Sequence, residues 1–306
     1  MKVLVTGVAG QLGHDVMNEL AKRGHEGVGS DLAAEYSGIA DGSAVTKMPY
    51  VSMDITDAAA VETVLQEVKP DAVVHCAAWT AVDLAEDDDK VDKVRSINAG
   101  GTKNIAEVCK KLDCKMVYIS TDYVFDGTNH LPYVETDNTC PASVYGRTKL
   151  AGEQALQEVC PDAVIIRTAW LYSEFGNNFV KTMLRLGNER EQLSVVFDQI
   201  GSPTYAGDLA ATILAVLVQA EADAFVPGIY HYSNEGVCSW YDFAVKIMEL
   251  GNAPCRVLPI ESKDYPAKAA RPHFSVLNKA KIKTIYKISI SHWEASLREC
   301  MKRITK

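Results

Sequence analysis

A glycine-rich turn near the start of the chain limits the fold more than any other stretch of the sequence. Residues 2–6 form an apolar run, and a helical pattern with Val16 and Leu20 on one face follows the turn Gly7-Val8-Ala9-Gly10-Gln11-Leu12-Gly13. Because glycine has no side chain, the backbone N–H groups that open the helix can approach a pyrophosphate, whose negative charge the helix dipole favours. A strand, a glycine turn and a helix in this order favour a dinucleotide-binding domain.

Strand and helix patterns alternate through the first half of the chain. Further strands are predicted at residues 26–30, 50–53, 72–76, 116–119 and 163–167. Helices are predicted at residues 58–68, from the acidic run at 86–89 through 112, and at 145–155. The alternation predicts an α/β fold with a Rossmann-like, doubly wound parallel sheet of six strands.

The composition shifts after residue 169. The remaining residues mix helices with short strands, which are predicted at 193–197, 229–232 and 256–260. Helices are predicted to begin near Asn178, Asp208, Ser239 and Ser291, with capping boxes at Ser239–Asp242 and Ser291–Glu294. We expect a dinucleotide-binding domain at residues 1–169 and a smaller, mainly substrate-binding lobe at residues 170–306, interleaved so that later segments return to the first sheet.

Length, charge and cysteine usage exclude several classes of protein. The 306 residues are 47% hydrophobic, and the formal charge of -9 argues against broad binding to nucleic acid or anionic membranes. Apolar stretches fall short of the roughly 20 residues that span a bilayer, and the chain opens on a strand rather than on a secretory signal, so we expect a cytoplasmic protein. The eight cysteines show neither zinc-ligand spacing nor a disulfide framework, and no metal site is predicted.

Acidic and small residues mark the expected path of the cofactor. Asp31 ends the second predicted strand, where a carboxylate commonly accepts hydrogen bonds from the adenosine ribose. A carboxylate there repels a 2'-phosphate, so Asp31 predicts a preference for NAD(H) over NADP(H); the alternative is an ordinary turn aspartate. Asp54 is placed to reach the adenine edge, and the small Ala77 and Ala78 suit a strand end that the cofactor passes closely.

Polar residues at the end of the fifth predicted strand mark the expected site of chemistry. Ser120, Thr121 and Asp122 directly follow the apolar run at 116–119. Open α/β sheets bind their ligands at the carboxyl ends of the strands. Hydroxyl and carboxylate groups are therefore expected to gather at this edge.

The helix predicted at 145–155 carries a phenol and an ammonium on one face, because Tyr145 and Lys149 are four residues apart. A nearby positive charge lowers the pKa of a tyrosine from about 10 toward neutrality. Such a phenol suits protonation of a carbonyl oxygen as it becomes an alcohol. The alternative is a tyrosine and a lysine on an ordinary solvated helix.

Asn98 lies within the long helix predicted to end at residue 112, on the same face as Val94, Gly101 and Ile105. Its amide is therefore expected to point inward. A buried amide needs partners, and a backbone carbonyl or an active-site water would serve.

Several motifs together resemble the extended short-chain dehydrogenase/reductase family. They are the glycine turn, Ala77-Ala78, Ser120-Thr121-Asp122-Tyr123-Val124-Phe125-Asp126-Gly127 and Tyr145-x-x-x-Lys149. With Thr80-Ala81-Val82-Asp83, the third motif is similar to the subgroup that reduces dTDP-linked 4-keto-6-deoxy sugars. The resemblance covers almost the whole chain, through Gly201-Ser202-Pro203-Thr204 and Ala270-Arg271-Pro272 to Leu277-Asn278.

This resemblance implies reduction of the sugar C4 keto group by NAD(P)H, giving dTDP-L-rhamnose. It implies that Tyr145 donates the proton, that Lys149 holds the nicotinamide ribose and lowers the tyrosine pKa, and that Thr121 hydrogen-bonds the sugar carbonyl. Residues implied to line the sugar pocket, beside Thr121, are Thr80, Asp122 and Trp170. Residues assigned to the cofactor, together with Tyr145 and Lys149, are Gly7, Gly10, Gln11, Leu12, Gly13, Asp31, Asp54, Ile55, Ala77, Ala78 and Trp79.

The expected partner is the nucleotide-sugar substrate, and the expected assembly is a homodimer, although no residue pattern establishes it. Candidates for binding the substrate diphosphate are Lys181, Lys268 and Arg271, with solvated surface charge as the alternative.

Three other functions on this scaffold are considered. A dehydratase carries Thr-Asp-Glu where this chain has Thr121-Asp122-Tyr123, so the missing carboxylate disfavours dehydration. A nucleotide-sugar epimerase returns the hydride to its substrate, and net oxidation of added NADH distinguishes it from a reductase. A non-catalytic protein is the third, since the regulatory beta subunit of methionine adenosyltransferase resembles these reductases. The presence of Thr121, Tyr145 and Lys149 favours catalysis.

Overall fold

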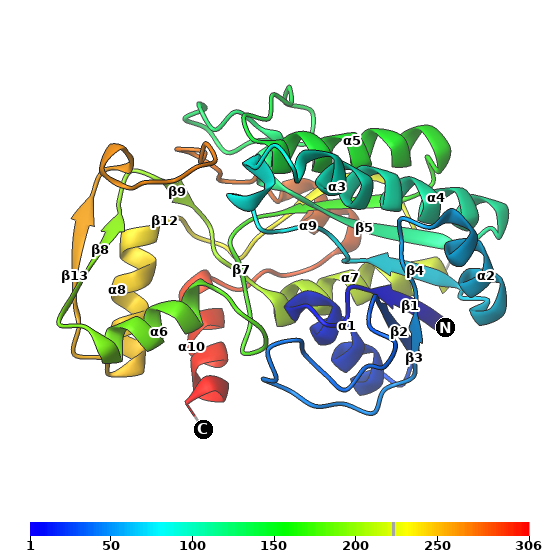
Figure 1. Ribbon diagram of the computed structural model, residues 1–306, viewed down its shortest axis with the longest axis horizontal. Coiled ribbons are helices and arrows are strands. Elements are labelled where there is room, and N and C mark those ends of the chain that lie inside the picture. The colour runs from blue at the N-terminus through cyan, green and yellow to red at the C-terminus, as the bar shows by residue number, and fades with distance from the viewer. Residues whose placement is uncertain (222–223, 306) are drawn as a thin grey trace.

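The large sheet contains seven parallel strands in the spatial order β11-β6-β5-β4-β1-β2-β3 (Figure 1). The computed structural model describes residues 1–221 and 224–305. The strands are β1 (Lys2–Thr6), β2 (Glu26–Asp31), β3 (Tyr50–Ser52), β4 (Ala72–His75), β5 (Lys115–Thr121), β6 (Val164–Thr168) and β11 (Gly228–Tyr232). The direction of chain progress reverses between β1 and β4, which places a ligand crevice beyond their carboxyl ends.

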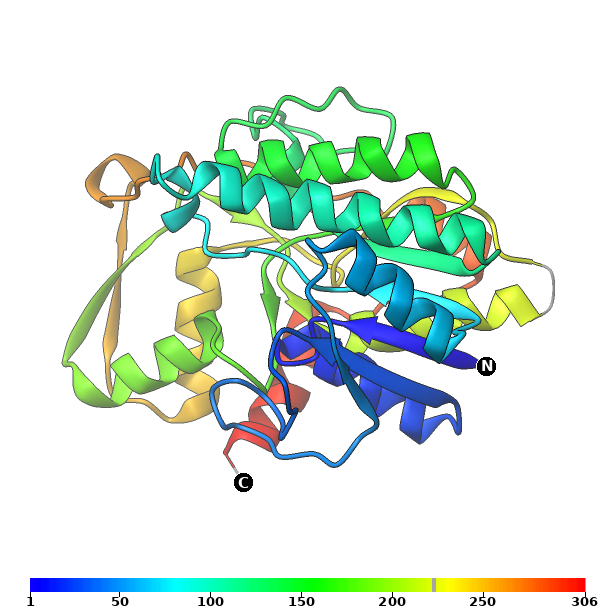
Figure 2. The same ribbon diagram turned by 45° about the vertical axis from the view of Figure 1, so that its right-hand side comes forward.

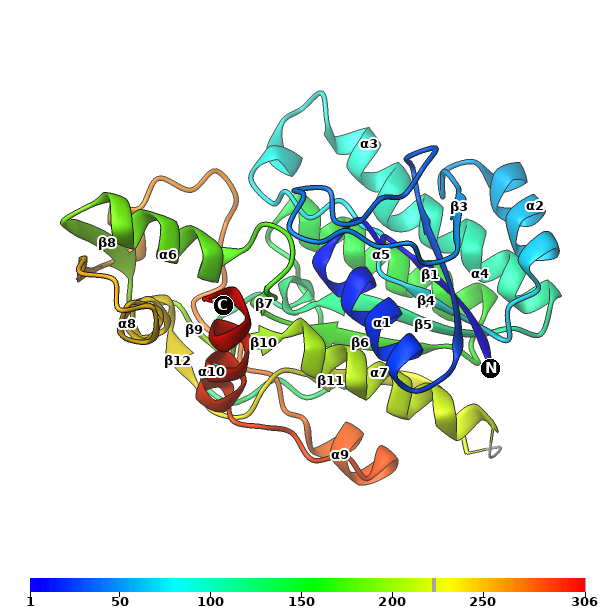
Figure 3. The ribbon, with the colours of Figure 1, turned by 90° about the horizontal axis from the view of Figure 1, so that it is seen from below.

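Helices cover both faces of this sheet. On one face α1 (Gln11–Lys22) lies beside α7 (Ala206–Glu221), and Figure 3 shows the pair from below. The opposite face is covered by α2 (Ala58–Val68), α4 (Thr102–Lys111) and α5 (Val144–Val159), which are seen above the sheet in Figure 2. Successive strand residues point to opposite faces, so Val3 and Val5 join the core with α1 while Leu4 joins the core with α2. Burial on both faces explains the nearly continuous apolar runs of these strands.

A smaller lobe stands to one side of the sheet, at the left of Figure 1. Its core is built from α6 (Phe179–Glu189), α8 (Trp240–Gly251) and α10 (Trp293–Ile304). Three two-stranded sheets join its segments: β8 (Gln192–Val196) with β13 (Arg256–Ile260), β7 (Leu171–Tyr172) with β10 (Thr204–Tyr205), and β9 (Ile200–Gly201) with β12 (Cys238–Ser239). The helix α9 (Ala280–Tyr286) returns to the large sheet and packs against β11.

The predicted parallel sheet is confirmed, with one strand added. Residues 229–232 were expected to form a short strand of the second half, and β11 pairs with β6 to extend the large sheet beyond six strands. The capping box of Ser239 with Asp242 is confirmed. The one predicted at Ser291 is wrong, because His292 is the N-cap of α10 and its Nδ1 accepts a hydrogen bond from the Glu294 backbone N–H.

The predicted long helix ending at residue 112 begins later than expected, at Val91, and contains a π-helical turn. A 3-10 turn, η1 (Leu84–Glu86), precedes α3 (Val91–Arg95), a π-helical turn, η2 (Ser96–Gly101), and α4. The acidic run at 86–89 therefore lies before the continuous helix and not in its first turn. The wider π turn carries Asn98, whose side chain is buried as predicted.

Candidate active site

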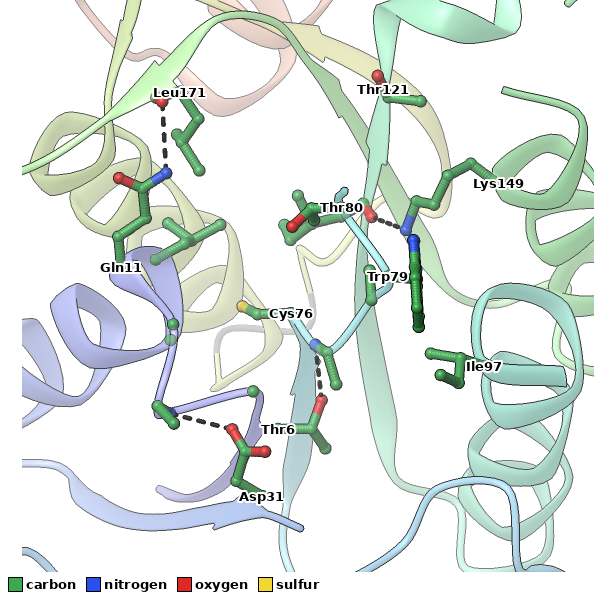
Figure 4. A pocket seen from close by; sticks show the side chains of 18 of the residues that line it. Thr6, Gln11, Asp31, Cys76, Trp79, Thr80, Ile97, Thr121, Lys149 and Leu171 are labelled. Atoms are coloured by element: carbon green, nitrogen blue, oxygen red, sulfur yellow. Dashed lines mark hydrogen bonds between the residues drawn. The ribbon is translucent and has the colours of Figure 1, made fainter. Parts of the chain in front are cut away.

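A cavity of about 1080 Å³ extends along the carboxyl ends of β1, β4, β5 and β6. It brings together every residue that the sequence assigned to the cofactor, the chemistry and the sugar, and Figure 4 shows part of its lining. The residues are Gly7, Gly10, Gln11, Leu12, Gly13, Asp31, Asp54, Ile55, Ala77, Ala78, Trp79, Thr80, Thr121, Asp122, Tyr145, Lys149 and Trp170. The smaller lobe adds Leu171 and residues 176–178 to the wall. The role of each residue remains a prediction.

The glycine turn closes one end of the cavity. Gly7 has a φ of 75°, and a Cβ added there would lie 2.7 Å from the backbone nitrogen of Ala77. A Cβ on Gly13 would lie 2.4 Å from the carbonyl oxygen of Gly7. Gly10 is the N-cap of α1 and supplies no side-chain cap, so the N–H groups of the first turn are left for a ligand. This cradle of backbone donors fits the diphosphate of a dinucleotide.

Asp31 ends β2 beside the glycine turn. Its Oδ2 accepts a hydrogen bond of 3.0 Å from the backbone N–H of Ala9, and its Oδ1 accepts one of 2.8 Å from the backbone N–H of Leu32. The carboxylate thus fixes the turn as well as lining the cavity (Figure 4). Each oxygen retains acceptor capacity for a ribose hydroxyl.

Asn98 holds the segment that follows β4. Its Oδ1 accepts a hydrogen bond of 2.8 Å from the backbone N–H of Trp79, and its Nδ2 donates to the carbonyl oxygen of Trp79 at 3.3 Å. Nδ2 also donates to Thr148 Oγ1 on α5 at 3.1 Å. The expectation of a backbone carbonyl partner is confirmed, and the amide joins the cavity wall to the helix that carries Tyr145.

The hydroxyl, phenol and ammonium groups meet where β5 ends and α5 begins. Ser143 caps α5 by accepting a hydrogen bond of 3.0 Å from the Gly146 backbone N–H. Thr121 Oγ1 donates to Asp122 Oδ1 at 2.9 Å, and the Thr121 side chain is a neighbour of the Tyr145 phenol. Lys149 Nζ donates to the carbonyl oxygen of Ile119 at 2.7 Å, as drawn in Figure 4.

Burial dominates the titration of this group. Burial raises the pKa of the Tyr145 phenol, and the charge of Asp122 raises it further. The interaction with the Thr121 side chain acts in the opposite direction and lowers it. Burial also lowers the pKa of Lys149 to about 7, opposed by the charge of Glu153. The direction predicted for Tyr145 from its lysine neighbour is therefore wrong in this structure, because desolvation of the phenolate and the charge of Asp122 outweigh the contact with Thr121.

Asp122 and Trp170 form the side of the cavity assigned to the sugar. Burial raises the pKa of Asp122 to about 7, and its Oδ2 has no hydrogen-bond partner among the described residues. Trp170 adopts a φ of 49° and stacks on Trp240 with ring centroids 3.7 Å apart. Gly201 makes room for the indole, since a Cβ there would lie 2.6 Å from Trp170 Cε2.

The three basic candidates for the diphosphate lie outside the cavity lining and are engaged in ion pairs. Lys181 pairs with Asp41 at 3.3 Å, and Lys268 pairs with Asp87. Arg271 pairs with Asp83 at 2.5 Å, so its guanidinium is not the solvated surface charge given as the alternative. Their role with the diphosphate stays a prediction.

The sequence predictions missed several parts of the wall, among them Asp92, Lys93, Ser96 and Ile97. Tyr123 lines the cavity, and its ring makes a T-shaped contact with the ring of Tyr145, with centroids 5.5 Å apart and planes at 76°. The loop predicted at residues 32–49 supplies residues 39–41, and Ser43 Oγ accepts a hydrogen bond of 2.8 Å from the backbone N–H of Gly176 in the smaller lobe. The motif around Thr121 pointed to Tyr123, whereas no periodic pattern marks the loop.

Within residues 1–221 and 224–305, no helix has the length and apolar character needed to cross a membrane. The same part of the chain contains no cluster of three or more histidine, cysteine, aspartate or glutamate side chains arranged to hold a metal ion.

Comparisons with known proteins agree with this architecture. The family model described as RmlD substrate binding domain matches residues 1–306. The chain is 38% identical to the spore coat polysaccharide biosynthesis protein SpsK of Bacillus subtilis over 301 residues, which cover 98% of this chain and 97% of that protein. It is also 38% identical over 305 residues to a dTDP-4-dehydrorhamnose reductase of Aggregatibacter actinomycetemcomitans, with 97% of each chain covered.

A solved structure gives the same result in three dimensions. The crystal structure of dTDP-4-dehydrorhamnose reductase (rfbD) from Bacillus anthracis in complex with NADP is 39% identical and superposes with a TM-score of 0.86 over 99% of each chain. Sequence and fold agree over the full length, so this chain belongs to the RmlD substrate binding domain family, within the extended short-chain dehydrogenases/reductases.

Proposed function

We propose that this chain is an NAD(P)H-dependent reductase of the C4 keto group of a dTDP-linked 4-keto-6-deoxy sugar, which converts dTDP-4-dehydrorhamnose to dTDP-L-rhamnose. One observation carries the proposal: Thr121, Tyr145 and Lys149 line the same cavity as the glycine cradle. The names of the A. actinomycetemcomitans and B. anthracis relatives support this substrate.

The two parts of the chain have different roles, one in binding the cofactor and one in binding the substrate. Residues 1–169 form the dinucleotide-binding domain, a division supported by the glycine turn and Asp31 at the cavity. Residues 170–306 form mainly the substrate-binding lobe, supported by Trp170 and residues 176–178 in the wall, while β11 and α9 return to the large sheet.

Tyr145 donates its proton to the C4 oxygen as that oxygen becomes a hydroxyl. Thr121 turns its single hydroxyl hydrogen from Asp122 Oδ1 to the same oxygen when the sugar binds. The reduced nicotinamide, when bound, supplies the hydride for C4. Lys149 uses one N–H group for the Ile119 carbonyl and keeps two donors for the nicotinamide ribose.

Asp122, Thr80 and Trp170 bind the sugar. The unpartnered Oδ2 of Asp122 supports this role, because a buried carboxyl oxygen gains a partner when a sugar hydroxyl donates to it. The stack of Trp170 on Trp240 supplies a rigid apolar surface.

The cofactor is NAD(H) by preference, with NADP(H) also accepted. The preference rests on Asp31, whose charge opposes a 2'-phosphate. Acceptance of NADP(H) is supported by the B. anthracis relative, which was solved with NADP.

The protein acts in the cytoplasm, and a homodimer is the expected assembly. Its eight cysteines form no disulfide, and six of them are buried, which suits a reducing compartment. Sedimentation of the purified chain tests the assembly, since a single species of twice the chain mass is expected.

A substrate panel tests the reaction. The protein is incubated with NADH or NADPH and with 4-keto-6-deoxy sugars linked to dTDP, UDP or GDP. We expect stoichiometric oxidation of the cofactor with the dTDP sugar. Interconversion of sugar epimers without net oxidation would assign the epimerase alternative, and the absence of any turnover would favour a non-catalytic binding protein.

A further inference from the structure

Glu153 lies one helical turn beyond Lys149 on α5, and both side chains are buried. Its carboxylate accepts a hydrogen bond of 2.5 Å from Ser120 Oγ on β5. It also accepts hydrogen bonds from two nitrogen atoms of Arg167 on β6, from Nε at 2.9 and 3.2 Å and from Nη2 at 2.6 Å. One carboxylate therefore joins α5 to both strands.

The Glu153–Arg167 pair is costly to bury. Its side chains are 1% and 3% exposed, and removing two charges from water costs several kcal/mol per ion before their attraction is counted. A pair of apolar residues of similar volume is often as stable or more so. Stability alone therefore does not explain why an ion pair is buried here, and its position beside the cavity suggests a functional role.

Each partner of the carboxylate adjoins a residue of the cavity. Ser120 lines the cavity itself and precedes Thr121, and Arg167 precedes Thr168, which also lines the cavity. Lys149 is tied to Ile119, the residue before Ser120. The contacts of Glu153 and Lys149 thus fasten α5 to consecutive residues of β5, directly behind Thr121.

The other titratable groups around Lys149 carry little negative charge near neutral pH. Burial lowers the pKa of His75 on β4 to about 3 and raises the pKa of Cys76 to about 12. Burial likewise raises the pKa of Tyr118 on β5, whose ring centroid lies 4.1 Å from Lys149 Nζ, and of Tyr145 on α5. Among these neighbours Glu153 is left as the carboxylate that favours the lysine cation.

We propose that Glu153 is a positioning residue that keeps Lys149 protonated and holds it in register with Thr121. The inference rests on the proposed function in one respect, since Lys149 acts there as a cation. Burial alone drives Lys149 toward the neutral amine, and the charge of Glu153 opposes that trend.

Two substitutions separate charge from shape. Glu153→Gln keeps the side-chain length and an acceptor for Ser120 but removes the charge. Glu153→Asp keeps the charge and shortens the side chain, so it is the matched control for lost packing. If the charge of Glu153 keeps Lys149 protonated, the pKa of Lys149 should differ between the two variants.

The direct measurement is an NMR titration of the full chain labelled at the lysine ε carbons, with the Lys149 signal assigned from Lys149→Met. We expect Glu153→Gln to lower the pKa of Lys149 by about one unit or more, and Glu153→Asp to leave it close to the wild-type value. The same midpoint in wild type and Glu153→Gln would overturn the proposal.

A second variant covers the case in which Glu153→Gln does not fold. Glu153→Leu combined with Arg167→Met replaces the ion pair by apolar side chains, an exchange that buried pairs often tolerate. The pKa of Lys149 is again expected to fall. Glu153 lies on the same helix as Lys149, whereas Arg167 lies on β6 and contacts Glu153, so we expect the loss of the Glu153 charge to dominate. An unchanged pKa in this variant would also contradict the proposal.

Activity adds an independent readout. With the sugar substrate, Glu153→Gln is expected to move the alkaline limb of the kcat/KM profile to lower pH, whereas a purely structural role would lower kcat/KM equally at every pH. The NMR titration needs no substrate, so it stands even if the wild-type chain reduces none of the panel sugars. Failure of the proposed function and failure of this inference are therefore distinguishable.

Discussion

The Nζ of Lys149 donates a hydrogen bond of 2.7 Å to the carbonyl oxygen of Ile119. This contact fixes the Lys149 ammonium on α5 against the strand that ends in Thr121, so the fold itself holds these two side chains close to each other. Such preorganisation matters because misplaced catalytic groups cost large factors in rate.

Replacing Tyr145 by phenylalanine removes the proposed proton donor and keeps the ring. We expect kcat to fall by roughly 10²-fold or more, since that is the usual contribution of a positioned acid, while NADH affinity stays within about twofold. Steady-state kinetics and a binding titration measure the two quantities. Undiminished turnover would remove Tyr145 from the mechanism.

Asp31→Asn tests the cofactor preference. The amide oxygen can still accept the hydrogen bond from the Ala9 backbone N–H, so the glycine turn is retained while the charge is lost. We expect the ratio of kcat/KM for NADH to that for NADPH to shrink by roughly tenfold, corresponding to about 1.4 kcal/mol of repulsion. An unchanged ratio would mean that Asp31 serves the turn alone.

Gly10→Ala tests the phosphate cradle. A Cβ at Gly10 would meet the carbonyl oxygen of Gly7 at 3.3 Å and no other described neighbour within 4 Å, and the φ of -93° suits alanine. We expect the fold to be kept and dinucleotide affinity to fall by about tenfold or more, because the methyl group covers the first-turn N–H groups.

Gly100→Ala is the matched control for this substitution, since its added Cβ would find nothing closer than 3.9 Å. Calorimetric titration of both variants with NADH measures the difference. Equal affinity in the two variants would place the diphosphate elsewhere.

Asp122→Asn tests the raised pKa of that carboxyl group. The folded-state pKa of about 7 exceeds the ordinary value of 3.8, so the folded protein binds the extra proton between these pH values. This contribution to stability is present in full at low pH and is lost as the pH rises through about 7, with a slope of at most about 1.4 kcal/mol per pH unit.

The asparagine variant should lack that slope. Urea unfolding of both proteins across this pH range measures it, and asparagine still offers Thr121 an acceptor in place of Oδ1. Parallel stability curves for the wild-type protein and the Asp122→Asn variant would show that the carboxyl group titrates normally.

Much of the fold and the cavity could be predicted because the relevant information is local. Apolar runs mark β1, β4 and β5, and residues such as Thr121 and Ala77 follow directly at strand ends, which parallel strands bring to one edge. The spacing of Tyr145 and Lys149 is likewise a property of one helix. Residues set by local geometry were therefore found from the sequence.

The remaining features depend on distant parts of the chain. The direction of the Tyr145 pKa was missed because burial, which dominates it, comes from the packing of several elements. The π turn at Asn98 was missed because the buried residues around it are spaced as in an ordinary α-helix, so the sequence shows no distinct pattern there. The pairing of Arg271 with Asp83 joins residues 188 positions apart, which no local pattern encodes.

The most direct test of the proposed reaction is to follow the hydride. The full-length protein is incubated with dTDP-4-dehydrorhamnose and with NADH carrying deuterium at the transferable C4 position, and the product is analysed by mass spectrometry and NMR. We predict dTDP-L-rhamnose with one deuterium at C4 and one oxidised cofactor per sugar, with almost no product from the Tyr145→Phe variant. Product without deuterium, or epimerised sugar without net loss of NADH, would contradict the assignment.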